Sequence, residues 1–210
     1  MPHLFWPTVL LGVALAGSHP AATRPSPQTA NPTAVKVAEG SVSFEVATNV
    51  FSTTVSGKST ALAGSTKLHD TGEALQLEQI EATVPVTTLR TGIRLRDEHM
   101  RKYIFETGDG ELPDVVFSAK NVRCSQASPK AYTCPTSGTL SIRGTPKPID
   151  VDLKVVKNGD GFEVSGDALI TLSTYGIERP SQFGVRTDDK VKIHVEFKAR
   201  SAAPASARAR

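Results

Sequence analysis

The sequence lacks several features that mark common functional classes. No apolar run approaches the roughly 20 residues that a bilayer-spanning helix requires. Positive charge is not concentrated either. Four of the 24 Lys and Arg residues lie outside residues 35–199, so that stretch holds 20 of them against all 21 Asp and Glu. A nucleic-acid-binding domain would carry excess positive charge in its folded part. The composition therefore predicts neither a membrane-spanning helix nor a nucleic-acid partner.

Catalytic signatures are missing as well. The chain contains no G-x-S-x-G motif of a serine hydrolase and no H-E-x-x-H motif of a zinc protease. Beyond the N-terminal segment its histidines are His69, His99 and His194, which lie on separate segments without the spacing of metal ligands. We predict no enzyme, no cofactor and no metal site. The alternative is an enzyme or metal protein that uses His99 or His69.

The N-terminus is typical of an exported protein. Residues 4–16 form a short apolar run, which ends in a small-residue cleavage site at 16–18. We interpret residues 1–18 as a signal peptide and residues 19–34, rich in Pro, Ala, Ser and Thr, as a flexible linker. Residues 200–210 contain no packing residue, which predicts a disordered basic tail. The expected location is the periplasm or the cell exterior, with no membrane span after cleavage.

Cysteine usage agrees with export. Cys124 and Cys134 are the only cysteines, and the sequence between them suits a turn that joins a strand at 115–123 to a strand at 136–142. A disulfide closing so short a loop would contribute about 2–3 kcal/mol by restricting the unfolded chain. The alternative, a pair of metal ligands, fits no zinc-binding spacing and has no histidine nearby. We therefore predict a Cys124–Cys134 disulfide that clips a hairpin.

Beyond residue 35 the chain alternates between apolar and polar residues, which is typical of strands with one dry and one wet face. The clearest runs are at 42–46, 80–86, 149–155, 162–172 and 191–197. Turn sequences at 70–72, 146–148 and 158–161 punctuate the pattern. Short connections imply antiparallel neighbours, and about eight such strands remove their edges only by closing into a barrel. Barrels of this size are filled by side chains or hold one small ligand.

One segment departs from the two-residue period. Residues 91–105 carry Ile93, Met100 and Ile104 among charges, with Thr91 placed to cap, which predicts a short helical segment. The cations around it are Arg90, Arg94, Arg96, Arg101 and Lys102. They are either a solvated helix face or a basic rim at the barrel mouth, and the spacing alone favours the solvated face.

Four motifs occur in a fixed order along the predicted barrel. Residues 50–57 (VFSTTVSG) come first, followed by Arg-Asp-Glu-His-Met at 96–100 and Leu-Pro-Asp-Val-Val-Phe-Ser at 112–118. Residues 138–148 (GTLSIRGTPKP) come last. As an ordered set they resemble the YceI-like family of secreted lipid-binding proteins, whose patterns include Arg-Asp-x-His-Leu and Pro-x-Ile-x-Phe-x-Ser. The sequence departs from the family pattern at 37–41 and 175–180, which leaves the head-group contacts open.

The resemblance implies that residues 35–199 form an extended, lipocalin-like antiparallel barrel whose apolar cavity holds a polyisoprenoid or similar lipid. The side chains expected to line the interior are Phe44, Val46, Val55, Val84, Phe117, Leu140, Val151, Leu153, Ile170, Ile193 and Val195. The helical segment would gate the mouth, with Arg96, Asp97 and His99 near the head group. A homodimer is compatible with this interpretation. The alternative is a secreted stress-response or protein-interaction module whose barrel is filled by side chains.

Overall fold

Strands make up most of the chain that the computed structural model describes, which comprises residues 32–51, 53–72 and 74–201. The predicted signal peptide, nearly all of the linker and most of the tail lie outside these residues. The strands are β1 (Thr33–Thr48), β2 (Thr54–Ser59), β3 (Ala63–Asp70), β4 (Ala74–Val84), β5 (Val115–Ser128), β6 (Ala131–Ile142), β7 (Thr145–Asn158), β8 (Gly161–Thr171), β9 (Ser181–Gln182) and β10 (Val185–Ser201). The first and last strands thus extend two residues beyond the predicted limits of the domain.

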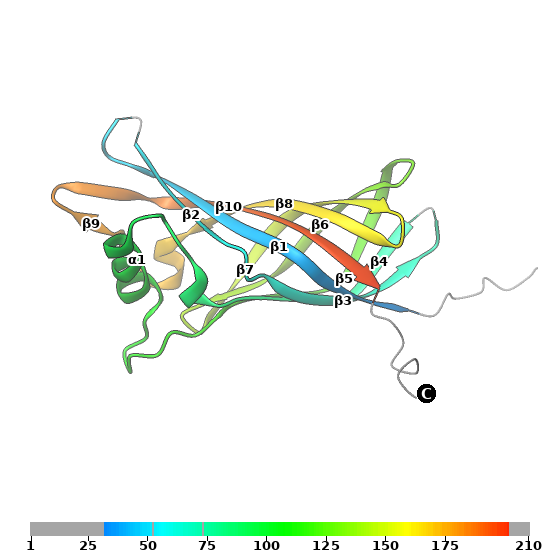
Figure 1. The fold of residues 1–210 in the computed structure, drawn as a ribbon, viewed down its shortest axis with the longest axis horizontal. Coiled ribbons are helices and arrows are strands. Elements are labelled where there is room, and N and C mark those ends of the chain that lie inside the picture. Colours follow the sequence, from blue (N-terminus) through cyan, green and yellow to red (C-terminus); the bar gives the residue numbers. More distant parts are fainter. Residues whose placement is uncertain (1–31, 52, 73, 202–210) are drawn as a thin grey trace, which may run out of the picture.

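The sheet closes because β1 and β10 pair with each other. The strand order is β2-β1-β3-β4-β5-β6-β7-β8-β10-β9, and β1 pairs with β10 from Val35 opposite Ser201 to Thr48 opposite Thr187. Every pairing of neighbouring strands is antiparallel. The result is a closed eight-strand antiparallel barrel, elongated along one axis, with one short α-helix near one end (Figure 1). The predicted fold class is confirmed.

The seam between β1 and β10 shows how the two-residue period sets the inner face. Val42 lies opposite Val195 and Phe44 opposite Ile193, so apolar residues meet on the face that lines the barrel interior. The intervening pair is Ser43 opposite His194. Because directly opposed residues share one face of an antiparallel pair, the register keeps all apolar residues of the seam inside.

The predicted turn at 146–148 is wrong. Pro146 and Pro148 lie within β7, opposite Ser141 and Thr139 of β6, and the turn before β7 is formed by residues 143–144. β8 pairs with β7 only from Asp152 onward, so this first part of β7 has a strand neighbour on one side only. Proline, which cannot donate a backbone hydrogen bond, is tolerated on such an unpaired side.

The departure from strand period at 91–105 produces the predicted helical segment. A 3₁₀ turn, η1 (Val86–Thr88), precedes α1 (Arg94–Met100), which continues into a wider π-helical turn, η2 (Arg101–Phe105). The predicted N-cap is wrong, because Ile93 occupies that position and makes no side-chain capping bond. Thr91 instead donates hydrogen bonds to Asp97. Val86, predicted as the end of a strand, is fully buried in η1.

The end of the barrel farthest from α1, which we call the closed end, is packed with side chains. Leu75, Cys124, Cys134 and Phe162 belong to one cluster there, with exposures of 1%, 2%, 0% and 9%. The predicted disulfide joins Cys124 to Cys134, with Cα atoms 4.1 Å apart. The cysteines lie within β5 and β6 rather than flanking a loop, and only residues 129–130 form the turn. The bridge therefore crosses neighbouring strands of the barrel wall.

Polar contacts close over the same end. Lys157 donates to an Oδ2 of Asp70 at 2.6 Å, and Asp70 accepts from the Gly72 N–H at 2.8 Å. The Tyr132 hydroxyl donates to the Gly72 carbonyl at 3.1 Å. These bonds hold the turn between β3 and β4 against β6 and β7, so that the turn lies against its neighbouring strands at the closed end.

Candidate functional site: a cavity along the barrel

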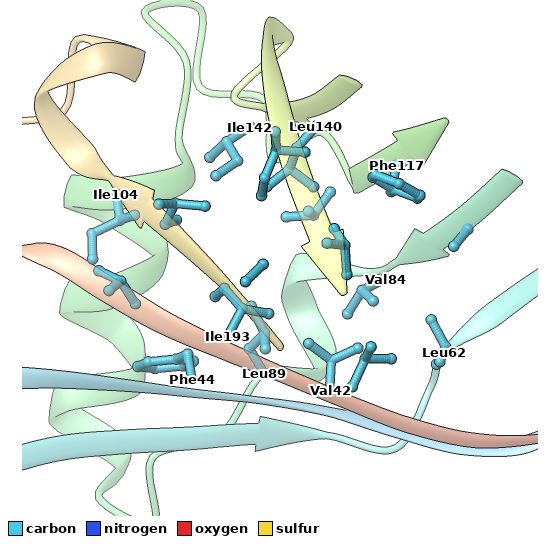
Figure 2. A pocket seen from close by; sticks show the side chains of 18 of the residues that line it. Val42, Phe44, Leu62, Val84, Leu89, Ile104, Phe117, Leu140, Ile142 and Ile193 are labelled. Atoms are coloured by element: carbon cyan, nitrogen blue, oxygen red, sulfur yellow. The ribbon is translucent and has the colours of Figure 1, made fainter. Parts of the chain in front are cut away.

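A cavity of about 1300 Å³ occupies the interior of the barrel. It exceeds the roughly 300–1,000 Å³ of most small-molecule sites. All eleven residues predicted to point inward, from Phe44 to Val195, border it. Figure 2 shows that the side chains of Phe44, Leu140 and Ile193 project into it from different strands. The space is therefore apolar over most of its length and suits a hydrocarbon.

Side chains in the half of the barrel near α1, which we call the mouth end, show that this space is not filled by packing. Val42, Phe44, Leu140 and Ile193 point into the barrel, yet each is only half-buried. An inward side chain in a packed core would lose nearly all of its exposed surface. Their remaining exposure faces the cavity, so these side chains provide apolar area that a ligand could cover.

Two aromatic rings lie against the wall because their neighbours are glycines. Phe44 of β1 lies opposite Gly57 of β2, and a Cβ added to Gly57 would come within 2.4 Å of the Phe44 ring. Phe117 of β5 covers Gly138 of β6 in the same way, with a Cβ placed 2.7 Å from its ring. Each ring occupies the space that a side chain at the neighbouring glycine position would fill. The glycines thus let two large side chains line the interior without crossing it.

The helical segment covers the mouth end with its apolar side. Met100, Ile104 and Phe105 border the cavity, and Met100 and Phe105 are buried at 7% and 9% exposure. Figure 2 shows Ile104 reaching toward the space from this segment. Ile93 and Leu95 are exposed instead. Of the three apolar residues that predicted an amphipathic segment, Met100 and Ile104 therefore face the cavity and Ile93 does not.

Asp97 fixes the start of α1. Its Oδ1 accepts hydrogen bonds from the Thr91 N–H at 2.6 Å and from the Thr91 hydroxyl at 2.5 Å, and the residue is 4% exposed. Burial raises the pKa of this carboxyl, but the two bonds from Thr91 and the nearby charges of Arg101 and Arg90 outweigh it, so the pKa lies below its usual value. Asp97 is not among the residues that border the cavity. The structure therefore places it where it orients the helix.

Arg96 and His99 border the cavity at its mouth. Arg96 donates from Nη2 to the Thr91 carbonyl at 2.6 Å, while its Nε is buried and has no hydrogen-bond partner among the described residues. His99 lies 3.3 Å from Oε1 of Gln182 through its Nδ1, and its ring meets the edge of Tyr103. The three residues predicted for the mouth are thus brought together on α1, but only Arg96 and His99 face the interior.

Sequence analysis missed further residues at the mouth. Arg143, from the turn between β6 and β7, borders the cavity together with Arg179, Gln182 and Arg186 from the segment around β9. These residues come from regions far apart in the sequence. The Arg143-Gly144 pair forms a tight hairpin turn with φ values of 55° and 71°, and its glycine is the feature of the sequence that could have indicated this turn.

The remaining histidines lie away from the mouth. His69 contacts Glu78 at 2.6 Å, and His194 contacts Asp167 at 2.8 Å on the outer surface. Within the part of the chain that the structure describes, no three His, Cys, Asp or Glu side chains gather closely enough to hold a metal ion. In the same part, none of the helices is long and apolar enough to cross a membrane.

Comparison with known proteins identifies the architecture. A family model described as the YceI-like domain matches residues 34–199. No curated protein matches the sequence.

Solved structures share the fold at low sequence identity. A polyisoprenoid binding domain from Saccharophagus degradans, implicated in plant cell wall breakdown, aligns with a TM-score of 0.60 at 15% identity, covering 81% of this chain and 99% of that one. BcnA from Burkholderia cenocepacia aligns with a TM-score of 0.59 at 16% identity, covering 76% and 95%. A YceI protein from Campylobacter jejuni aligns with a TM-score of 0.55 at 18% identity, covering 70% and 85%. At this level of identity the likeness concerns the fold.

Proposed function

This chain belongs to the YceI-like domain family, and from that premise we propose that it is an exported protein that sequesters or carries a polyisoprenoid-type lipid inside its barrel, without catalysis. The observation that carries the proposal is the apolar cavity of about 1300 Å³, bordered by inward side chains of β1 to β8 and β10. The polyisoprenoid binding domain of Saccharophagus degradans, which has the same fold, supports the choice of ligand class.

The cavity can supply the binding energy without specific polar contacts. Burying one CH₂ group is worth about 0.8 kcal/mol, so ten buried ligand carbons would contribute roughly 8 kcal/mol before the costs of ordering. Half-buried Phe44, Leu140 and Ile193 would lose their remaining exposure at the same time. A long hydrocarbon chain therefore fits both the size and the chemistry of the space.

We place the polar end of the ligand at the mouth. The buried Nε of Arg96 is a donor without a partner among the described residues, and it lies on a side chain that borders the cavity. A head-group oxygen at the mouth would accept a hydrogen bond from the Arg96 guanidinium, and His99 lies one helical turn away on the same segment. Asp97 would act through Thr91 by holding this part of α1 in place.

Export is supported by the disulfide. Cross-strand disulfides such as Cys124–Cys134 form and persist in oxidising compartments such as the periplasm or the cell exterior. The signal peptide proposed at residues 1–18 would deliver the chain there. Sequencing the N-terminus of the mature protein tests this point, and retention of residues 1–18 in the cell would contradict it.

Organic extraction of the purified protein, followed by mass spectrometry, tests the ligand. We expect a long-chain isoprenoid, or uptake of added polyprenol by protein that carries none. Ala168→Trp places a large ring in the cavity, whereas Leu169→Trp changes the next residue, which is exposed on the outer face. A168W should lose uptake and L169W should keep it. Equal uptake by both variants would contradict binding inside the barrel.

A matched pair of ligands tests the head-group site. Arg96→Gln should weaken binding of a polyprenol roughly ten- to hundredfold, because a hydrogen bond to a charged donor contributes roughly 1.5–3 kcal/mol. Binding of an isoprenoid hydrocarbon of the same length should stay unchanged. A similar loss for both ligands would mean that Arg96 only shapes the mouth.

The other hypotheses are less consistent with the structure. A protein-interaction module with a side-chain-filled barrel does not explain an interior of this volume. An enzyme that uses His69 would work at a site outside the cavity, since His69 does not border it, whereas His99 does border it. Metal analysis of the purified protein tests a metal site at either histidine. Native mass spectrometry of the exported protein would report bound ligand, disulfide and any homodimer in one measurement.

A further inference from the structure

The mouth end carries side chains that are unusual for a surface in contact with water. Phe51 is 97% exposed in the turn between β1 and β2, and Phe183 is 96% exposed in the turn between β9 and β10. Tyr103 of η2 is 60% exposed. Large apolar side chains that project fully from a protein commonly mark a site of interaction. We call these three residues the tip surface.

Contacts between the segments hold the tip surface together. The Asn49 side chain donates to the Gly184 carbonyl at 3.1 Å and accepts from the Arg186 N–H at 2.7 Å, which links the two hairpins beside their phenylalanines. Gln182, next to Phe183, contacts His99, and His99 packs against Tyr103. In Figure 1 both hairpins and α1 lie at the same end of the barrel. The three aromatic residues therefore share one end of the molecule.

The tip surface is continuous with the cavity. Phe183 and Tyr103 border it, together with Val185 and Thr187 of the same hairpin. Whatever covers the tip surface therefore lies at the entrance to the apolar interior.

Charge around the tip surface distinguishes between possible partners. Residues 90–105 hold five cations against two acids, and one of the acids is the buried Asp97. The Lys102 ammonium lies 5.9 Å from the centre of the Tyr103 ring. The four acids of residues 106–114 belong to the loop that extends on the other side of α1 from the hairpins (Figure 1). The cations thus lie beside the exposed aromatics, whereas the acids of residues 106–114 lie away from them. The exposed acid of α1, Glu98, lies 3.6 Å from Arg94.

We propose that the tip surface docks the protein on an anionic membrane, with Phe51 and Phe183 inserted among the lipids and the cations of the helical segment at the head groups. Exposed aromatic residues beside Lys and Arg are the combination that binds proteins to the interface of a bilayer. The orientation directs the mouth of the cavity toward the membrane and keeps the acidic loop away from it. Docking goes beyond ligand binding, since it requires only the outer surface.

Sedimentation with vesicles tests docking directly. We expect the protein to bind vesicles of mixed phosphatidylcholine and phosphatidylglycerol, and to bind phosphatidylcholine alone more weakly. F51S/F183S should lower binding at least about tenfold, because two large apolar side chains lose their burial in lipid. The control V156S/L169S removes two exposed apolar side chains from the barrel wall and should bind as the unchanged protein does.

A charge variant separates the two contributions. R94Q/K102Q changes two exposed cations that do not border the cavity, and it should reduce binding to the mixed vesicles and the sensitivity of that binding to salt. Binding to phosphatidylcholine alone should change little. Equal salt sensitivity in the variant would overturn the assignment of these cations to the head groups.

Two further results would overturn the proposal. One is unchanged vesicle binding by F51S/F183S; the other is a fall in mass from dimer to monomer in that variant, which would assign the tip surface to a second copy of the chain. The single variant Phe51→Ser, at a residue that does not border the cavity, should lose vesicle binding while keeping its lipid. If the unchanged protein takes up no lipid but binds vesicles, the proposed function is contradicted and membrane docking is still supported.

Discussion

The two ends of the barrel are built from the same alternating strands but use their inward side chains differently. At the closed end, Leu75, Val122 and Cys134 are at most 5% exposed and pack against one another. At the mouth end, Val42, Leu140 and Ile193 point the same way and stay half-buried beside the cavity. Alternation alone therefore decides which face is apolar, while the neighbours across the barrel decide whether that face is packed.

This difference suggests a division of roles along the barrel. The closed end has the disulfide, a cluster of buried side chains and the bonds that fix the turn between β3 and β4. The mouth end leaves apolar area uncovered and has the helical segment and the tip surface. We infer that stability is concentrated at the closed end, where a side-chain deletion costs most, and that ligand binding is concentrated at the mouth end.

The same substitution at both ends tests this inference. Leu75→Ala would leave a void among packed side chains, and such changes lower the free energy of unfolding by about 2–5 kcal/mol. Both leucines border the cavity, but Leu140 is only half-buried whereas Leu75 is 1% exposed, so Leu140→Ala should cost roughly half as much or less. Urea unfolding of both variants measures the difference. Equal losses would mean that the two ends are packed alike.

Loss of the disulfide is the next largest expected effect. Cys124→Ala together with Cys134→Ala should lower the free energy of unfolding by about 2–3 kcal/mol, since the unfolded chain gains the freedom of an opened loop. Lipid uptake at temperatures where the variant remains folded should not change, because neither cysteine borders the cavity. Reduction of the unchanged protein should reproduce the loss. Impaired uptake in the folded variant would show that the two ends are coupled.

Most of the fold could be predicted from the sequence because its signals are local. The alternation of apolar and polar residues in 42–46, 162–172 and 191–197 correctly placed the predicted inward residues of these runs on the face that borders the cavity. Closure followed from the number of strands and the short turns. The turn predicted at 146–148 was wrong because proline is a local signal for turns, whereas the unpaired side of β7 depends on where β8 stops pairing with it, at Asp167 opposite Asp152.

The open interior could not be predicted in this way. Parity assigns a side chain to a face but does not say how far it reaches across the barrel. Phe44 lies against the wall only because Gly57 stands opposite, and that register joins strands whose pairing the sequence does not state. The mouth is similar, since Arg143, Arg179 and Arg96 meet there only after the barrel closes. Thr91 was wrongly predicted as a helix cap because its hydrogen bonds to Asp97 depend on the burial of Asp97, which the local sequence does not show.

A smaller effect is expected where α1 is attached at the mouth end. Asp97→Ala would leave the N–H of Thr91 without its acceptor, which costs about 1–2 kcal/mol for a group removed from water. The loss should be local, with faster hydrogen exchange across 94–105 and faster release of bound lipid. Glu98→Ala, at the exposed next residue, is the matched control and should change neither rate. Faster exchange at the closed end as well would mean that the helical segment stabilises the whole barrel.

The smallest expected effect is a pH dependence at the closed end. Burial raises the pKa of Asp70, but the hydrogen bonds from Lys157 and the Gly72 N–H outweigh it, so the pKa of the folded protein lies below the usual value. An unfolded Asp titrates near pH 4, so the stabilisation is present above about that pH and is lost as the pH falls through the lower folded value. The bond to Asp70 also raises the pKa of Lys157. The stabilisation from Lys157 is therefore present below its unfolded pKa of about 10.4 and lost as the pH rises through the higher folded value.

Asp70→Asn should remove both dependences at a cost of at most about 1 kcal/mol near neutral pH, because the Lys157 ammonium is partly solvated. Unfolding free energies measured from acid to alkaline pH should then be flatter for the variant, while its lipid uptake stays unchanged. A variant that keeps the acid slope of the unchanged protein would show that the slope comes from carboxyls other than Asp70.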